Sequence, residues 1–222
     1  MLKKLSQYRF KAFFFSQVLL LFGSLVVPAA LHETVVSPLL LLMNLGAGIL
    51  FTVGKKHLFW FLLLLLVTAY VVISFSLLAY LDHSTAEFVK MGTALVFYVV
   101  IGLEIIRQVW RAVSVDKNVI LGLISGYLSL GIIGTFVCTC IELANPGSFR
   151  GLSDDPNLLS IELNYYSYIT LLTIGYGDIV PLSNIARTSS VLIGLLGQIY
   201  IVIITAVVVG KYISQNELKN EV

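Results

Sequence analysis

The sequence predicts an all-α integral membrane protein with six transmembrane helices and one shorter re-entrant helix. Of the 222 residues, 58% are hydrophobic and only 12% are charged. The mean hydropathy is +0.96, well above that of an ordinary soluble domain. The apolar residues are gathered into stretches of about 20, the length that a helix needs to cross a hydrocarbon layer of ~30 Å. Short clusters of charge separate these stretches, which is the pattern of a multi-pass membrane protein.

Six apolar stretches are candidate spans. In chain order they cover Ala12–Leu31, Pro38–Gly54, Leu58–Leu81, Met91–Val109, Asn118–Ile141 and Thr188–Ile213. The basic residues before the first stretch resemble the start of a signal peptide, but the stretch is too long for one. We therefore expect a retained first span. A further stretch, Asn157–Leu172, is too short and too interrupted to cross the membrane and is expected to be re-entrant.

The distribution of charge predicts the orientation of these spans. With the N-terminus inside, all of the 14 Lys and Arg residues except Lys90, Arg150 and Arg187 fall in cytoplasmic segments. Cytoplasmic loops of membrane proteins collect Lys and Arg, so we expect a cell-membrane protein with both termini in the cytoplasm. The net charge is only +2 and the basic residues lie at membrane edges. Membrane lipids are therefore the expected surroundings, and nucleic acid is not an expected partner.

The chain divides into two predicted domains. Residues 1–112 hold four spans with little polar content and form a four-helix membrane domain. Residues 113–222 hold a span, the re-entrant segment, a second span and a short tail. Polar chemistry within the membrane is concentrated in this second domain.

A glycine-containing segment, Thr173–Asp178, follows the re-entrant stretch. A dehydrated cation that crosses a membrane needs oxygen ligands in place of its water, and backbone carbonyls can supply them when successive C=O groups face one axis. That backbone needs glycine at alternate positions, as at Gly175 and Gly177. We expect the ligands to be the carbonyls of Thr173, Ile174, Gly175 and Tyr176, with the Thr173 hydroxyl at the innermost site. The Ile174 and Tyr176 side chains should pack behind this strand.

The segment reads TIGYGD and resembles the TVGYGD signature of potassium channels, with Ile in place of Val. The resemblance covers Asn118–Ile213 and includes Pro181 and Gly197. It identifies the chain with the six-transmembrane-helix potassium channels of the two-helix-pore (ion channel) family, bacterial type. It implies a selectivity filter that conducts K⁺ passively, with permeant K⁺ as the only bound ion and no enzymatic activity. It also implies a homotetramer, because one filter strand cannot enclose an ion and a closed cyclic assembly can.

The re-entrant helix would be the pore helix of that family. Ser160 is a plausible N-cap, with Glu162 in the first turn, where the helix dipole favours an acid. The resemblance implies filter support from Asp178, with Tyr165 bound to its carboxylate and Tyr166 reaching the hydroxyl of Tyr176; the alternative is that both are ordinary interface aromatics. Two residues depart from the family pattern, since Leu172 replaces a Thr and Ile169 stands where some relatives have Glu.

The last span is expected to carry the gate. Gly197 lies where the family commonly has a hinge glycine, and helical steps from it place Gln198, Ile201, Thr205 and Val209 along the cavity and inner entrance. Apolar side chains at a constriction can gate by dewetting. The alternative is that Gly197 only permits close helix packing, as we expect of Gly122 and Gly126 on the fifth span.

The four-helix domain resembles a voltage-sensor frame that lacks gating charges. A sensor needs several basic residues along one helix face, each contributing ~2.3 kcal/mol per 100 mV. The fourth span offers only Arg107 and Arg111 at its cytoplasmic end, and Glu104 is spaced to pair with Arg107 one turn away. We therefore expect little dependence of conduction on voltage.

Three other functions remain as alternatives. A potassium transporter would repeat its filter-like loop within one chain and usually keep a single glycine in each, and a non-conducting accessory subunit would not need a complete filter. An enzyme would need catalytic groups in the membrane, but His32, His57 and His83 all fall in predicted loops. Cys138 and Cys140 are two apart within a span, with no His or acid pair nearby, and are expected to be packing residues.

Overall fold

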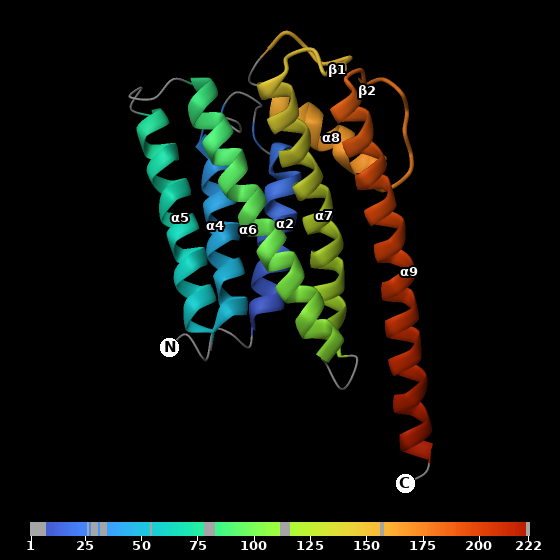
Figure 1. The fold of residues 1–222 in the computed structure, drawn as a ribbon. Helices are drawn as coiled ribbons and strands as arrows, with labels where there is room; N and C mark the ends of the chain where they lie inside the picture. The colour runs from blue at the N-terminus through green and yellow to red at the C-terminus, as the bar shows by residue number, and fades with distance from the viewer. Residues whose placement is uncertain are drawn as a thin grey trace.

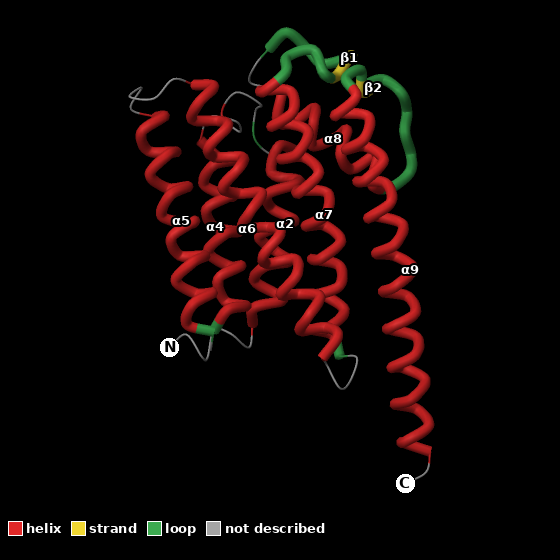
Figure 2. Tube along the Cα trace, in the orientation of Figure 1, coloured by secondary structure: helices red, strands yellow, loops and turns green. Residues whose placement is uncertain are grey.

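The computed structural model describes residues 8–25, 27, 31, 35–53, 55–77, 83–111, 116–155 and 158–220. The elements are α2 (Arg9–Phe22), η2 (Gly23–Leu25), α4 (Ser37–Ile49), η4 (Leu50–Thr52), α5 (Lys56–Leu77), α6 (His83–Arg111), α7 (Lys117–Ala144), β1 (Phe149–Arg150), α8 (Leu159–Leu171), β2 (Val180–Pro181) and α9 (Asn184–Asn220). The fold is all-α apart from the two short strands, as Figures 1 and 2 show.

The long helices lie side by side, with successive helices running in opposite directions (Figure 1). The helices α2, α4, α5, α6 and α7 form a bundle, and α9 runs beside α7 at its edge. The short helix α8 lies at one end of the molecule between α7 and α9. There β1 and β2 pair in antiparallel register, with Phe149 opposite Pro181 and Arg150 opposite Val180. The start of α2 and the end of α9 lie at the opposite end (Figure 1).

Three helices in the described part of the chain are long and apolar enough to cross a membrane. They cover Phe88–Arg111, Lys117–Ala144 and Asn184–Lys211, and two shorter apolar helices cover Ser37–Thr52 and Lys56–Val72. These ranges overlap five of the six expected spans. The expected first span is helical as α2, but part of Ala12–Leu31 lies outside the described residues. The chain is therefore a membrane protein with several apolar helices, and the number of six spans remains a prediction.

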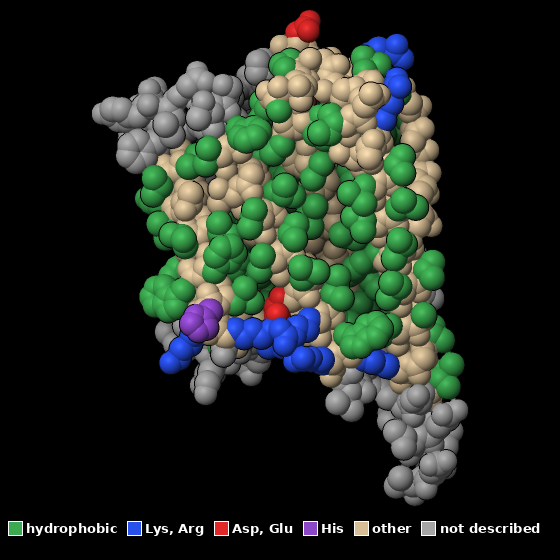
Figure 3. Space-filling model, in the orientation of Figure 1, with side chains coloured by type: hydrophobic (Ala, Val, Ile, Leu, Met, Phe, Trp, Pro, Cys, Tyr) green, Lys and Arg blue, Asp and Glu red, His purple; other side chains and the backbone are tan. Residues whose placement is uncertain are grey.

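The side chains on the surface change character along the helices. Hydrophobic side chains cover the middle of the molecule, and Lys and Arg side chains gather in a belt at the end where α5 begins and α6 ends (Figure 3). Lys55, Lys56, Arg107 and Arg111 lie at these helix ends. Trp60 and Trp110, which are 67% and 65% exposed, lie close to them along the chain, and such amphipathic aromatics are typical of a membrane–water interface.

The apolar core runs without interruption across the expected domain boundary. One cluster contains Phe13 of α2, Leu45 of α4 and Ile101 of α6 together with Leu123 and Phe136 of α7. The helix α7 contacts α2, α6, α8 and α9, and its small residues allow this. A side chain at Gly122 would collide with Phe10, and one at Gly126 with the hydroxyl of Tyr200. The expected packing role of this glycine pair is therefore confirmed, and Cys138 packs in a second core cluster as a free thiol, as predicted.

A buried polar network also crosses that boundary. The Gln17 side chain of α2 is fully buried and its amide donates to the Ser129 hydroxyl of α7 at 2.8 Å. Asn44 of α4 donates to the Ser16 hydroxyl at 2.6 Å, and its amide oxygen accepts from the Tyr98 hydroxyl of α6. Buried polar groups are costly unless paired. These bonds therefore favour one packing of the four N-terminal helices against α7.

The expected pairing of Glu104 is wrong. Glu104 is 5% exposed and pairs with Lys55, which lies between η4 and α5, rather than with Arg107 one turn along α6. The Gln108 amide donates to the same carboxylate at 2.7 Å and to the Phe51 carbonyl at 2.9 Å. The reason lies in the tertiary packing of α6. The Glu104 face of α6 turns into the bundle, whereas Arg107 is exposed.

Candidate functional site

The re-entrant segment folds as the helix α8, packed against α7. The Ser167 hydroxyl donates to the Gly131 carbonyl and the Tyr168 hydroxyl to the Leu128 carbonyl, both at 2.7 Å. The Thr135 hydroxyl of α7 donates to the Asn164 amide oxygen at 3.0 Å. Polar bonds between helices, together with buried apolar side chains of α8, fix its position beside α7. The segment that follows α8 is therefore held in a defined position relative to α7.

The expected start of this helix needs a correction. The helix begins at Leu159 with Leu158 at its N-cap position, and no side chain caps it. Ser160 therefore lies inside the first turn rather than at the cap. Glu162 lies in the first turn, as predicted. Its carboxylate accepts a hydrogen bond from the Ser153 backbone N–H at 3.0 Å and so fastens the preceding loop to α8.

The backbone of the segment after α8 alternates in handedness. Thr173, Gly175 and Gly177 have φ values of +59°, +56° and +80°, whereas Ile174 and Tyr176 are not in this left-handed region. Glycine adopts such values freely and other residues rarely do. The predicted need for glycine at alternate positions is thus met at Gly175 and Gly177. Thr173 extends the same alternation one step toward α8.

Three N–H groups of this segment bind back to α8. Ile174 N–H and Gly175 N–H both donate to the Ile169 carbonyl, at 2.8 and 3.2 Å, and Thr173 N–H donates to the Thr170 carbonyl at 3.0 Å. In a planar trans peptide the C=O points away from the N–H. The Thr173 and Ile174 carbonyls therefore point away from α8. The segment presents a row of backbone oxygens on the face that its own chain does not use.

The Thr173 hydroxyl donates to the Leu172 carbonyl at 2.7 Å. A hydroxyl that donates one hydrogen bond keeps both oxygen lone pairs. The Thr173 side chain can therefore still offer an oxygen to a cation, as the innermost site requires. Leu172, one of the two residues that depart from the pattern of the resembling family, is 45% exposed and contributes its carbonyl to this bond.

Two expected packing contacts are not made within the chain. Ile174 is 47% exposed and Tyr176 is 73% exposed, so neither side chain is covered by the segments behind the strand. The reason is that no other described segment of the chain covers this side of the strand. Both side chains are apolar or aromatic and lie on a surface that a second copy could cover.

The Asp178 carboxylate accepts a hydrogen bond from the Tyr165 hydroxyl at 2.6 Å, the contact that the resemblance implies. This bond holds the pKa of Asp178 below its ordinary value, and the same bond raises the pKa of Tyr165 to about 12. Both groups lie at the end of the strand, outside the spanning helices. The mouth of the segment therefore keeps a negative charge over the neutral range.

Tyr166 makes a different contact from the expected one. Its hydroxyl pairs with the Ser190 hydroxyl of α9 at 2.6 Å, rather than with the hydroxyl of Tyr176. The Tyr166 side chain is 4% exposed and faces the last helix, which leaves Tyr176 on the opposite, exposed side. Ser190 is thus a supporting residue that sequence reasoning missed, since only its place within the last span was visible.

The loop between α7 and α8 provides further support that the sequence did not single out. A side chain at Gly151, which has φ +97°, would collide with the Asp178 carbonyl, so this loop lies directly against the end of the strand. The Glu142 carboxylate accepts from the N–H groups of Gly147 and Phe149 at 2.6 and 3.0 Å. The sequence signal was the pair of loop glycines, Gly147 and Gly151.

The residues expected to line the cavity lie on α9. Gln198, Ile201 and Val209 are exposed in the single chain, and the side chain of Thr205 lies outside the described part. The helix continues unbroken through Gly197. A side chain at Gly197 would lie 2.6 Å from the Leu171 carbonyl oxygen of α8. Gly197 therefore has a packing role, and its use as a hinge stays a prediction.

The pH dependence of the Tyr165–Asp178 contact can be predicted. Because the pKa of Asp178 is lowered, its stabilisation is complete above the pKa of an unfolded Asp, about 3.9, and is lost as the pH falls through the lower folded value. We expect thermal stability and conduction that do not depend on this group between pH 5 and 8. Tyr165→Phe should remove this contribution, so that stability falls at pH 5 to 8 and changes less between neutral and acidic pH. Unfolding curves at a series of pH values would measure this shift in the pH profile. Tyr166→Phe is the matched control, and an equal shift in both variants would contradict the assignment.

One comparison with known proteins matches the region that contains this segment. Residues 151–214 match the family model described as "Ion channel", a range that includes α8, the glycine-containing strand and most of α9. No curated protein matches the chain, and no solved structure matches it. The C-terminal region of this helical membrane protein is therefore an ion-channel pore domain, and its function is that of a channel rather than of an enzyme.

Proposed function

We propose that the protein is a potassium-selective channel whose filter is Thr173–Asp178. The observation that carries this proposal is the hydrogen bonding of the strand. Its N–H groups bind back to Ile169 and Thr170, so the Thr173 and Ile174 carbonyls face the other way. The alternation of φ at Thr173, Gly175 and Gly177 supports the same direction for the Gly175 and Tyr176 carbonyls. A row of carbonyls can replace the water shell of K⁺.

The channel is proposed to be a homotetramer with the pore on its four-fold axis. A single strand offers oxygens from one side only, and Ile174 and Tyr176 are uncovered in the chain alone. The apolar helix α9 is also largely uncovered, since only 12% of its most apolar 18-residue stretch is buried. Neighbouring copies and lipid would together cover this surface. Both termini are proposed to be cytoplasmic, in line with the start of α2 and the end of α9 lying at the end with the basic belt (Figures 1 and 3).

Conduction is proposed to depend little on voltage. Of the three Lys and Arg residues of α6, Arg107 and Arg111 are exposed at its final turns and Lys90 lies near its start. The buried charge of α6 is the acid Glu104, held by Lys55 and Gln108. A helix with this arrangement carries little movable positive charge through the field. The four N-terminal helices therefore resemble a sensor in frame only.

Flux through the purified full-length protein in liposomes tests the function. With a potassium gradient the vesicles should pass K⁺, and with a matched sodium gradient the flux should be at least about a hundredfold lower. Equal passage of Na⁺ would contradict selectivity. No passage of either ion would favour an accessory subunit, and flux that needs a second coupled ion would favour a transporter. A particle of two chains rather than four would contradict the assembly, and a steep sigmoidal activation curve in a planar bilayer would contradict voltage independence.

A further inference from the structure

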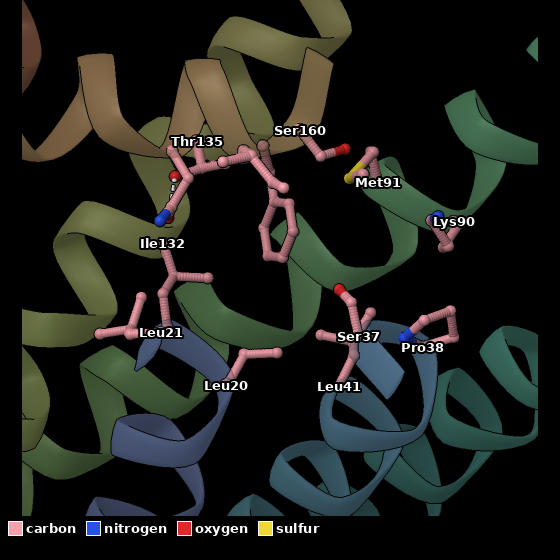
Figure 4. Close-up of a pocket in the computed structure, with 13 residues that line it drawn as sticks. Leu20, Leu21, Ser37, Pro38, Leu41, Lys90, Met91, Ile132, Thr135 and Ser160 are labelled. Atoms are coloured by element: carbon pink, nitrogen blue, oxygen red, sulfur yellow. Dashed lines mark hydrogen bonds between the residues drawn. The ribbon is translucent and has the colours of Figure 1, made fainter. Parts of the chain in front are cut away.

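A cleft of about 100 Å³ lies where the four N-terminal helices meet the pore helix. Its walls come from α2, α4, α6, α7 and α8, and Figure 4 shows the side chains that line it. The cleft lies toward the α8 end of the molecule, since Ser160 and Ile161 of the first turn of α8 line it. A ligand here would touch the N-terminal helices and the pore helix at the same time.

The lining combines an apolar surface with a polar edge. The apolar residues include Leu20 and Leu21 of α2 and Ile132 of α7, and the polar residues include Lys90, Ser37 and Ser160. In Figure 4 Lys90, Ser37 and Ser160 lie toward one side of the cleft together with Met91 and Pro38, and Leu20, Leu21 and Ile132 lie toward the other together with Thr135. A soluble anion would leave the apolar side uncovered. A pure hydrocarbon would make no hydrogen bond with these polar side chains.

The size of the cleft limits what enters. A cleft of about 100 Å³ is far smaller than a whole phospholipid, so only the first part of a hydrocarbon chain fits inside. The remainder of such a molecule would lie along the protein in the bilayer. A Lys side chain near a helix end can extend its amine to the level of the headgroups while its stem stays among apolar groups. An amphiphile with an anionic head and a hydrocarbon chain therefore fits both sides of the cleft.

We propose that this cleft binds an anionic phospholipid from the leaflet on the α8 side. Its phosphate lies at Lys90 with the Ser37 and Ser160 hydroxyls, and the start of an acyl chain lies against Leu20 and Ile132. A cation beside two hydroxyl donors is complementary to a phosphate. The carboxylate of Glu162, on the same helix turn as Ser160, is bound to the Ser153 N–H.

Occupancy of the cleft should affect conduction, and this part rests on the proposed channel function. Asn164, which lines the cleft, accepts a hydrogen bond from the Thr135 hydroxyl and so links α8 to α7. Two turns later α8 ends at Leu171, next to the filter. A lipid that fills the space beside Asn164 and Ile161 supports the outer face of the pore helix. Conduction should therefore be higher when the lipid is present.

Binding is tested on the delipidated full-length protein by native mass spectrometry with phosphatidylglycerol and phosphatidylcholine of equal chain length. The first phosphatidylglycerol should bind more tightly than phosphatidylcholine, and Lys90→Gln should weaken it about fivefold, which corresponds to the loss of one Lys near an anionic surface. Leu20→Trp, which fills the apolar side, should weaken both lipids. Arg111→Gln, an exposed charge at the other end of α6, is the matched control and should leave the first binding step unchanged.

The results that overturn the site are equally specific. Equal affinity of the wild type for the two lipids would mean that only hydrocarbon fills the cleft. Unchanged binding in both Lys90→Gln and Leu20→Trp would mean that another part of the chain covers it, and an equal loss in Arg111→Gln would mean a general charge effect.

Flux in the same vesicles separates this proposal from the proposed function. Potassium flux of the wild type should rise with phosphatidylglycerol, and that of Lys90→Gln should not. Lys90-dependent binding without potassium flux in any lipid would keep the site and overturn the channel proposal. Potassium flux that depends neither on phosphatidylglycerol nor on Lys90 would contradict an effect of the site on conduction.

Discussion

Replacing Gly177 by alanine should abolish potassium flux while leaving the chain folded. Gly177 has φ +80°, and an L-residue with a side chain pays roughly 1–2 kcal/mol to stay in this region. If the backbone relaxes instead, the peptide between Tyr176 and Gly177 turns and takes the Tyr176 carbonyl with it. In a tetramer the cost applies four times, about 4–8 kcal/mol. Since 1.4 kcal/mol is a factor of ten, filters with all four strands in place would become at least about 10³-fold rarer.

Gly147 provides the matched control for this variant. It has nearly the same φ, +82°, and a side chain at either Gly147 or Gly177 would meet nothing within 4 Å. Gly147→Ala therefore imposes the same backbone strain in the outer loop, and both variants should lose a similar amount of thermal stability. Only Gly177→Ala should lose flux in liposomes. Normal flux in Gly177→Ala would overturn the filter, and loss of flux in both variants would show that strain anywhere in the chain prevents assembly.

The sequence predicted the local conformation of this strand because glycine reports directly on the backbone. Gly175 and Gly177 alternate with larger residues, and the structure has positive φ at both. Thr173 has a positive φ as well, which its β-branched side chain gave no reason to expect. The contact of two N–H groups with the single Ile169 carbonyl holds the backbone in this state. The alternation predicted from two glycines thus extends further than the glycines do.

Helix extents were predicted less well than helix positions. The helix α9 covers 37 residues, well beyond the expected Thr188–Ile213, and α6 begins at His83 rather than near Met91. Hydropathy identifies the part of a helix that suits hydrocarbon, whereas the helix itself continues into polar sequence where backbone hydrogen bonds still favour it. Ser160 was misplaced as a cap for a related reason, because boundaries depend on how the preceding loop is held.

Side-chain partners could not be predicted where they depend on tertiary packing. Glu104 was expected to bind Arg107 because the two are neighbours on one helix, but Lys55 lies nearer in the folded bundle. Tyr166 was expected to reach Tyr176 and binds Ser190 on α9 instead. The exposure of Ile174 and Tyr176 was missed for a different reason. The sequence predicted that both side chains pack behind the strand, but it does not show which segments of the chain would cover them.

Gly197→Ala should reduce potassium flux by at least about tenfold, and Gly194→Ala should not. A side chain at Gly197 would lie 2.6 Å from the Leu171 carbonyl oxygen and 2.8 Å from the Leu171 Cδ1. The Leu171 side chain can rotate away, but its carbonyl belongs to the end of α8 and cannot move without the filter strand that follows. Overpacking of this kind costs typically 1–3 kcal/mol. Displacement of α8 should move Thr173 out of line with the Thr173 residues of the other chains in the proposed tetramer.

Gly194 is the control because it lies three residues earlier on the same helix. A side chain there would lie 3.9 Å from the Thr170 carbonyl oxygen, an ordinary contact. Alanine is also a better helix former than glycine by about 1 kcal/mol, so Gly194→Ala should raise thermal stability and leave flux near the wild-type level. The two variants stiffen α9 to the same extent and differ only in the approach to α8.

That difference separates the two roles considered for Gly197. If Gly197 acts as a hinge, the loss of flexibility matters, and single-channel recordings of Gly197→Ala should show a changed open probability at an unchanged unit conductance. If Gly197 acts by close packing, the filter itself is displaced, and the unit conductance and the preference for K⁺ over Na⁺ should both fall. The unbroken helix through Gly197 and the proximity of the Leu171 carbonyl favour the second result. If Gly197→Ala kept its unit conductance and its selectivity but changed its open probability, Gly197 would act as a hinge of the gate, and the packing explanation would be wrong.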